Sequence, residues 1–169
     1  MKIAVLTDSS AYLSKAQQEK YKIDVIPLPI IWDNHIYKDL VDISYENFYK
    51  KLKNSATLPT TSQPSTGEVK KYIDKYVAQG YTDVIVIPLS SGLSSLYSSL
   101  KNFASEEKGI NIHLFDPKIT CAGEADAAIL AARLVQKGAD VDLIMHDLEN
   151  LRNTMGVRFM VDDLKHLRR

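Results

Sequence analysis

The chain has 169 residues, and its 21 lysines and arginines balance its 21 aspartates and glutamates, so the formal net charge is zero. A balanced chain carries no strong electrostatic field, which argues against nucleic acid as a partner. The single cysteine excludes an intrachain disulfide and a metal site built from several cysteines, and the length suits one α/β domain with a substantial core.

The N-terminus leads directly into a predicted strand. Residues 2–6 are mostly apolar and follow Met1 without a signal-peptide pattern. No apolar run approaches the length of a membrane-spanning helix. We therefore expect a cytoplasmic protein without an integral membrane segment, which makes at most a transient contact with a membrane surface. Ser9 or Ser10 is then expected to cap a helix over residues 14–20.

The segment that follows is predicted to be less regular. Residues 21–31 are apolar but contain two prolines, which indicates an edge strand or an extended crossover. Residues 32–35 are typical of a hairpin turn. A helix is expected over residues 44–52, with its aromatic side chains available for the core. Residues 58–67 are polar and bracketed by prolines, so we expect an ordered loop without regular structure.

The second half of the chain alternates helices and strands. Ser65 or Thr66 is expected to cap a helix over residues 67–79, with Glu68 completing a capping box. Residues 84–87 are apolar and rich in β-branched side chains, which is typical of a strand buried on both faces. Further along we expect a helix from about Ser94, a strand over 110–115, helices over 122–136 and 141–152, and a strand over 157–161.

This alternation predicts a Rossmann-like α/β fold with a mainly parallel sheet and helices on both faces. In such folds, ligands bind at the carboxyl ends of the strands. Three hydroxyl-rich loops, at residues 7–10, 60–65 and 90–95, are expected to meet there. The last of them leads into a helix N-terminus, which suits an anion. Serine and threonine are also ordinary helix caps, so the alternative that these loops only cap helices stays open.

The residues favour binding over catalysis. A serine nucleophile would need a positioned base, and the four histidines belong to no catalytic motif. Asp8 could act as a base or a metal ligand, but a single aspartate after a strand is equally a turn or cap residue. We therefore expect a site that binds an anionic group through neutral donors, with no cofactor and no metal.

Four segments together resemble the DegV family, and the resemblance covers the whole chain. They are Thr7-Asp8-Ser9-Ser10, Leu58-Pro59-Thr60-Thr61-Ser62-Gln63-Pro64-Ser65, Leu89-Ser90-Ser91-Gly92-Leu93-Ser94 and Val161-Asp162-Asp163-Leu164-Lys165. The resemblance implies a bacterial protein that holds one long-chain fatty acid, such as hexadecanoate, in a tunnel. Some members are the binding subunit of bacterial fatty acid kinase. They present the carboxylate to a separate kinase subunit, which forms an acyl phosphate for phospholipid synthesis.

The same resemblance implies which residues hold the ligand. The carboxylate is expected to bind the hydroxyl groups of Thr61, Ser62 and Ser94. The secondary candidates for lining the site are Asp8, Ser9 and Ser91. No residue is expected to be catalytic, because the kinase activity belongs to the partner.

The sequence departs from the family pattern at two points. Ser95 stands where the family usually has glycine, and the chain stops where the family continues into a second α+β domain. We expect residues 1–160 to form the N-terminal α/β domain and residues 161–169 to begin the connection to an absent C-terminal domain. The chain is thus expected to be an N-terminal fragment, with exposed apolar surface that a dimer would hide.

Two other classes of function stay open. One is a phosphoryl or acyl transferase that uses Ser90–Ser95 as an anion cradle and Asp8 as a base or metal ligand. The other is a structural or regulatory domain whose polar loops only cap helices.

Overall fold

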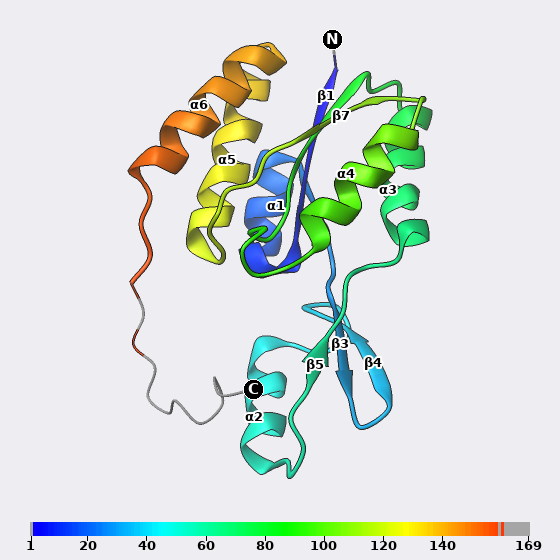
Figure 1. The fold of residues 1–169 in the computed structure, drawn as a ribbon, viewed down its shortest axis with the longest axis vertical. Coiled ribbons are helices and arrows are strands. Elements are labelled where there is room, and N and C mark those ends of the chain that lie inside the picture. The colour runs from blue at the N-terminus through cyan, green and yellow to red at the C-terminus, as the bar shows by residue number, and fades with distance from the viewer. Residues whose placement is uncertain (1, 159, 161–169) are drawn as a thin grey trace.

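The computed structural model describes residues 2–158 and 160, and its larger part is built on a four-stranded parallel sheet of order β2-β1-β6-β7 (Figure 1). The strands are β1 (Ile3–Asp8), β2 (Ile23–Ile26), β6 (Asp83–Ile87) and β7 (Asn111–Leu114). Every residue of the two central strands is buried, as the continuous apolar runs predict. The predicted α/β class and mainly parallel sheet are therefore confirmed.

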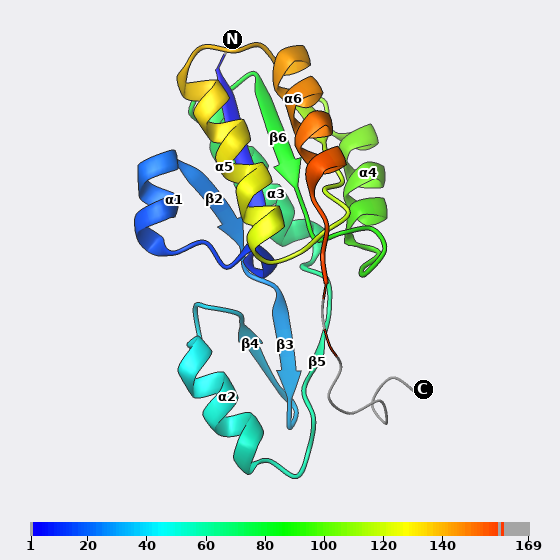
Figure 2. The ribbon, with the colours of Figure 1, turned by 90° about the vertical axis from the view of Figure 1, so that its left-hand side faces the viewer.

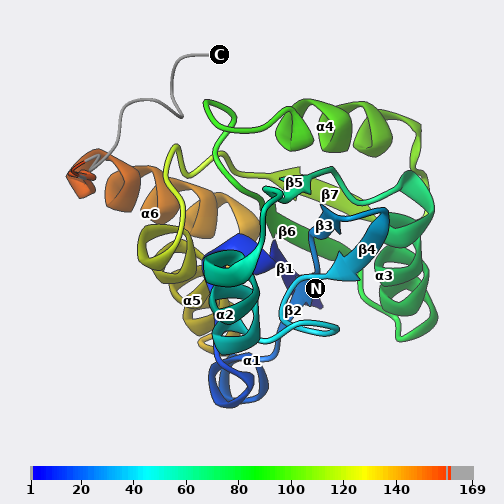
Figure 3. The same ribbon diagram turned by 90° about the horizontal axis from the view of Figure 1, so that it is seen from below.

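Helices cover both faces of this sheet, because alternate residues of each strand point to opposite faces. On one face, Ile3 and Val5 of β1 pack with α5 (Ala122–Gln136) and α6 (Val141–Thr154). On the other face, Ala4 and Leu6 pack with α3 (Thr66–Ala78) and α4 (Leu96–Glu106). Figure 3 shows the two helical layers on either side of the sheet, with α1 (Lys15–Tyr21) beside α5. The result is a three-layer fold with two apolar cores.

The chain between β2 and α3 forms a second, smaller sheet, which lies below the first in Figure 2. It is antiparallel, in the order β4-β3-β5, and consists of β3 (Pro29–Trp32), β4 (His35–Lys38) and β5 (Thr60–Thr61). The helix α2 (Tyr45–Asn54) accompanies it. Its Phe48 contacts the buried Trp32 edge to face, with ring centroids 5.4 Å apart. The aromatic residues of α2 therefore serve this small unit and not the main core.

The small sheet changes two expectations. The apolar segment over residues 21–31 divides into β2, an edge strand of the main sheet, and β3 of the small one. The loop expected over residues 58–67 is not wholly irregular, because Thr60 and Thr61 pair with β3 as β5. The predicted hairpin turn is confirmed, and Asp33 and Asn34 adopt the left-handed conformation that such a turn requires.

Most predicted helix caps are confirmed, with one correction at the N-terminus. Ser65 and Glu68 form the expected capping box of α3, and Asp140 caps α6. The cap of α1 is Ser14, and not Ser9 or Ser10. Residues 9–11 instead form a short 3-10 turn, η1 (Ser9–Ala11), because the Asp8 side chain accepts the Ser10 N–H.

The C-terminal expectations are tested only in part. The strand expected over residues 157–161 is not formed at 157, 158 or 160, and residues 159 and 161–169 lie outside the described residues. The domain boundary after residue 160 therefore stays a prediction. Among the described residues, no helix combines the length and apolar character needed to cross a membrane.

Candidate functional site

The main sheet has a topological switch point between β1 and β6. The chain leaves β1 for β2 on one side, and it leaves β6 for β7 on the other. The loops after these strands therefore diverge above a crevice at their carboxyl ends, where α/β folds bind ligands. The Leu89 N–H donates a hydrogen bond to Asp8 Oδ2 over 2.7 Å and so ties the loop after β6 to the end of β1.

A polar pocket of about 360 Å³ lies beside this crevice. Thr61 and Ser62 line it from the end of β5, and Ser94 lines it from the loop before α4. The remaining lining residues are Leu28, Gln63, Leu89, Leu93, Ser95 and Leu96. The structure therefore brings together the three hydroxyl residues that the sequence indicates, from two loops more than thirty residues apart.

The hydroxyl groups of Ser62 and Ser94 make few hydrogen bonds within the protein. Ser94 Oγ accepts the N–H of Leu96 over 3.1 Å, so its own proton is free for a ligand. Ser62 is anchored through its backbone N–H, which donates to the Pro29 carbonyl over 3.1 Å. Its hydroxyl has only a 3.4 Å contact with the Gln63 carbonyl. These side chains can therefore donate to an anion without breaking the structure.

An apolar pocket of about 240 Å³ adjoins the polar one. The two share Leu28, Thr61 and Leu89 as lining residues. The other residues that line the apolar pocket are Ser10, Tyr12, Ile30, Asp39, Leu40, Tyr45, Phe48, Tyr49 and Pro59. Together the two pockets present hydroxyl groups at one end and mostly apolar and aromatic side chains at the other, which suits an amphipathic anion.

Two of the titratable groups in the wall of the apolar pocket have a raised pKa. Burial raises the pKa of the Asp39 carboxyl, and burial together with the nearby Asp39 raises the pKa of the Tyr12 phenol. Both shifts favour the neutral forms, because a charge in a partly dehydrated wall is costly. The sequence carries no signal for these two residues, since they come together only when the small sheet packs below the main one.

The secondary site candidates do not line the polar pocket. Asp8 and Ser9 are only 2% and 1% exposed. Ser9 Oγ accepts the N–H of Leu28 over 3.0 Å, and Ser91 bonds through its hydroxyl and its N–H to Asp116. Their hydrogen bonds hold the surrounding loops.

The burial of Asp8 also removes support for its role as a base or metal ligand. Its oxygens accept the N–H groups of Leu89 and Ser10 and the hydroxyl of Ser10. Over residues 2–158 and 160, no group of three or more His, Cys, Asp or Glu side chains could hold a metal ion.

A residue that the sequence does not indicate lies beneath the site. Glu124, in the first turn of α5, is fully buried, and burial followed by the charge of Asp8 raises the pKa of its carboxyl to about 9. Its oxygens lie 3.1 Å from Thr7 Oγ1 and 2.7 Å from Ser10 Oγ. An acidic residue in the first turn of a helix normally lies at the surface, where it interacts favourably with the helix dipole. The sequence therefore gives no indication that Glu124 is buried.

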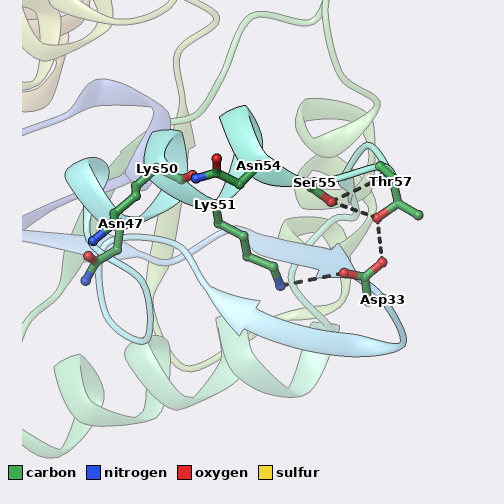
Figure 4. A pocket seen from close by; sticks show the side chains of 8 residues that line it. Asp33, Asn47, Lys50, Lys51, Asn54, Ser55 and Thr57 are labelled. Atoms are coloured by element: carbon green, nitrogen blue, oxygen red, sulfur yellow. Dashed lines mark hydrogen bonds and ion pairs between the residues drawn. The ribbon is translucent and has the colours of Figure 1, made fainter.

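A larger and more open pocket, of about 620 Å³, lies between α2 and the β3–β4 hairpin (Figure 4). Its polar groups bond to one another. Asp33 accepts the hydroxyl of Thr57 over 2.5 Å and lies 3.9 Å from Lys51 Nζ. Lys51 also lies over the Trp32 ring, 4.6 Å from its centroid. These contacts hold the β3–β4 hairpin against α2 and so stabilise the small unit.

The fold and the paired pockets define the class of protein: an α/β protein in which a polar and an apolar pocket adjoin at the carboxyl ends of the parallel strands. The chain belongs to the DegV family, whose model, described as an uncharacterised protein of the DegV family, matches residues 2–169. It is 42% identical over 173 residues to a DegV domain-containing protein of Staphylococcus aureus and 38% identical over 170 residues to Protein DegV of Bacillus subtilis.

Solved structures agree with this assignment. The chain is similar to the crystal structure of DegV, a fatty acid binding protein from Bacillus subtilis, with a TM-score of 0.94, 37% identity and 99% of this chain covered. It is also similar to a DegV lipid binding protein from Thermotoga maritima, with a TM-score of 0.81, 32% identity and 90% coverage. The chain spans 60% and 55% of these two structures and 59% of the Staphylococcus relative. The two solved structures are described as those of a fatty acid binding and a lipid binding protein, in agreement with the expectation that the family binds a lipid.

Proposed function

We propose that this protein binds a long-chain fatty acid, with the carboxylate in the polar pocket and the tail entering the apolar one. The observation that carries the proposal is that the polar and the apolar pocket adjoin, with Leu28, Thr61 and Leu89 lining both. Thr61, Ser62 and Ser94 supply the donors for the carboxylate. The relatives from Bacillus subtilis and Thermotoga maritima, described as fatty-acid- and lipid-binding, support this ligand class.

The energetics assign different tasks to the two pockets. Burying one methylene group contributes about 0.8 kcal/mol, so a sixteen-carbon tail contributes on the order of 10 kcal/mol before the costs of binding. Each hydrogen bond to the charged carboxylate contributes about 1.5–3 kcal/mol. The tail therefore dominates affinity, while the hydroxyl groups fix the position and orientation of the head group.

The chemistry of the polar pocket suits a carboxylate that is handed on to a separate kinase. Thr61, Ser62 and Ser95 are exposed, so a carboxylate among them is reachable from the surface. No lysine or arginine of the described chain lines this pocket. Neutral donors hold the anion without neutralising it, which leaves its oxygen nucleophilic toward a phosphoryl donor. Phosphorylation by a cytoplasmic partner kinase, giving an acyl phosphate, is the finer part of the proposal.

Native mass spectrometry of the protein as its gene encodes it, purified from the source organism, tests the ligand. The expected result is an added mass equal to one long-chain fatty acid, released under denaturing conditions. A bound nucleotide or metal ion would favour the transferase alternative instead. A protein free of any small molecule, which also takes up no added hexadecanoate, would overturn the proposal. The same spectra give the number of copies in the assembly.

A further inference from the structure

The buried Glu124 belongs to a chain of hydrogen bonds that ends in the wall of the apolar pocket. Ser10 Oγ lies 2.7 Å from Glu124 Oε2 and 2.6 Å from Asp8 Oδ1. The other oxygen of Asp8 accepts the Leu89 N–H over 2.7 Å. Ser10 lines the apolar pocket, and Leu89 lines both pockets. One side chain of α5 is thereby linked to the loops after β1 and after β6.

Counting protons shows that this chain of contacts needs a neutral acid. The Ser10 hydroxyl has one proton but lies within hydrogen-bond distance of two carboxyl groups. If both carboxyl groups were ionised, the single Ser10 proton could serve only one of them. The other carboxylate oxygen would then face the Ser10 oxygen with no proton between them, and the two oxygens would repel each other. One carboxyl group must therefore be protonated and donate to Ser10.

The backbone donors decide which carboxyl group carries the proton. Asp8 accepts the N–H groups of Ser10 and Leu89, which stabilise a negative charge. Around Glu124, the described hydrogen bonds involve only the hydroxyls of Thr7 and Ser10. The Thr7 hydroxyl also contacts the Ile87 carbonyl, over 2.7 Å, so its single proton is shared. The proton therefore belongs to Glu124.

The surroundings of Glu124 point the same way. The apolar core in which α5 packs contains side chains of α6 and β6, among them Ile144, Leu148 and Ile87. Asp8 is the charged group that acts on Glu124. Tyr21 of α1 packs against the same core, and the Arg152 guanidinium of α6 lies over the ring of its Phe115, 5.2 Å from the centroid. Burial and the negative Asp8 together raise the Glu124 pKa to about 9, in agreement with the proton count.

We propose that Glu124 is a positioning residue, which as a neutral acid donates to Ser10 and so holds Ser10 and Leu89 in the walls of the ligand pockets. The consequence for fatty-acid affinity rests on the proposed function. The protonation of Glu124 and the placement of Leu89 do not, and they can be measured without ligand.

The first test is the pH dependence of thermal stability for Glu124→Gln, which keeps a donor but cannot ionise. The carboxyl of an unfolded chain ionises near 4.5, whereas the folded protein keeps the proton up to about 9. Folding therefore takes up a proton between these values, and the wild type loses stability relative to the variant as pH rises. The expected result is a melting-temperature difference that grows in favour of the variant from pH 6 to pH 9. The exposed control Glu106→Gln is expected to differ from the wild type by the same melting-temperature difference at pH 6 and pH 9. The same pH-independent difference for Glu124→Gln would overturn the inference.

The second test is the placement of Leu89, followed by amide hydrogen exchange. In Glu124→Leu, which fills the space without a donor, protection of the Leu89 amide is expected to fall about tenfold, and Glu124→Gln is expected to restore it. Unchanged protection in Glu124→Leu would overturn the positioning role. If Glu124→Leu does not fold, the pH profile of Glu124→Gln still decides the protonation.

The third test uses hexadecanoate as the probe at pH 7. Glu124→Leu is expected to bind it about fivefold more weakly than Glu124→Gln, the effect of one lost hydrogen bond. If the wild type binds no hexadecanoate, the proposed function fails while the exchange and stability results still decide the role of Glu124. If the wild type and Glu124→Leu bind it equally, the proposed function stands and the positioning role is overturned.

Discussion

The side-chain amide of Gln63 donates a hydrogen bond to the hydroxyl of Ser95, joining the loop after β5 to the residue that precedes α4. Both residues line the polar pocket. A glycine at position 95 would have no side chain to accept this bond. The Ser95 hydroxyl therefore connects the two loops that carry the proposed carboxylate donors.

This connection predicts coupling between the two residues. Gln63→Ala and Ser95→Gly are each expected to weaken hexadecanoate binding about fivefold, and the double variant is expected to lose little more, because both changes break one bond. Isothermal titration calorimetry of the four proteins measures the coupling. The exposed Gln79→Ala, on the far end of α3, is the control. Strictly additive losses would show that the bond does not organise the pocket.

The carboxylate donors are tested by the pair Ser62→Ala and Ser94→Ala. Hydrogen bonds to a charged group are worth about 1.5–3 kcal/mol each, so the double variant is expected to lose at least tenfold in affinity for hexadecanoate. Its melting temperature is expected to fall by only about 2–4 °C, because the two hydroxyls contribute one bond accepted from the Leu96 N–H and one long contact with the Gln63 carbonyl. The matched control is Ser98→Ala with Ser99→Ala, on the exposed side of α4. Unchanged fatty-acid occupancy in the double variant would count against the site.

The proposed path of the tail from the polar to the apolar pocket is tested at Leu28, which lines both. Leu28→Trp is expected to block this path and to reduce hexadecanoate affinity about tenfold or more, because each methylene group left in water loses about 0.8 kcal/mol of binding free energy. Octanoate, whose tail reaches less far, is expected to lose less. Binding of both acids by fluorescence displacement provides the measurement, with Leu143→Trp on the exposed side of α6 as control. Equal losses for both acids would place the tail elsewhere.

The buried Asp83 makes the free energy of unfolding depend on pH in the acidic range. Burial acts to raise the pKa of this carboxyl, but hydrogen bonds from Thr82, His113 and Asn111 together hold it below its usual value of 3.8. Because the folded-state pKa is lowered, the ionised carboxyl contributes its full stabilisation above the usual value of 3.8. This stabilisation is lost as pH falls through the folded-state pKa. Asp83→Asn is therefore expected to cost about 1–3 kcal/mol at pH 7 and less at pH 3. Urea unfolding at the two pH values checks the difference, and an equal cost at both would contradict it.

The cap that follows the Thr60–Ser65 segment has a purely structural role. Ser65 Oγ accepts the Glu68 N–H over 3.2 Å, and Glu68 Oε2 accepts the Ser65 N–H in turn. Ser65→Ala is expected to cost about 1 kcal/mol of unfolding free energy, or about 2–4 °C in melting temperature, with hexadecanoate affinity unchanged. Calorimetric melting and titration measure the two effects. A large loss of affinity with no loss of stability would move Ser65 into the binding site.

The sequence by itself determined the local elements of this protein. The apolar runs at residues 3–6 and 84–87 indicate buried strands, the helix over residues 122–136 is found with its predicted bounds, and Ser65 with Glu68 marks the start of α3. These features depend on side chains only a few positions apart, so periodicity and cap chemistry reveal them. The motif serines and threonines likewise indicated the polar pocket, because family resemblance and local loop composition agree on them.

Only the tertiary structure decided which distant groups meet. It placed residues 29–61 in a separate small sheet, gave Thr60 and Thr61 a strand partner in β3, and opened the apolar pocket beside the polar one. It also buried Glu124 against Thr7, a residue 117 positions away. The burial and the protonation of a carboxyl group depend on neighbours that long-range packing supplies, and no local pattern in the sequence records them.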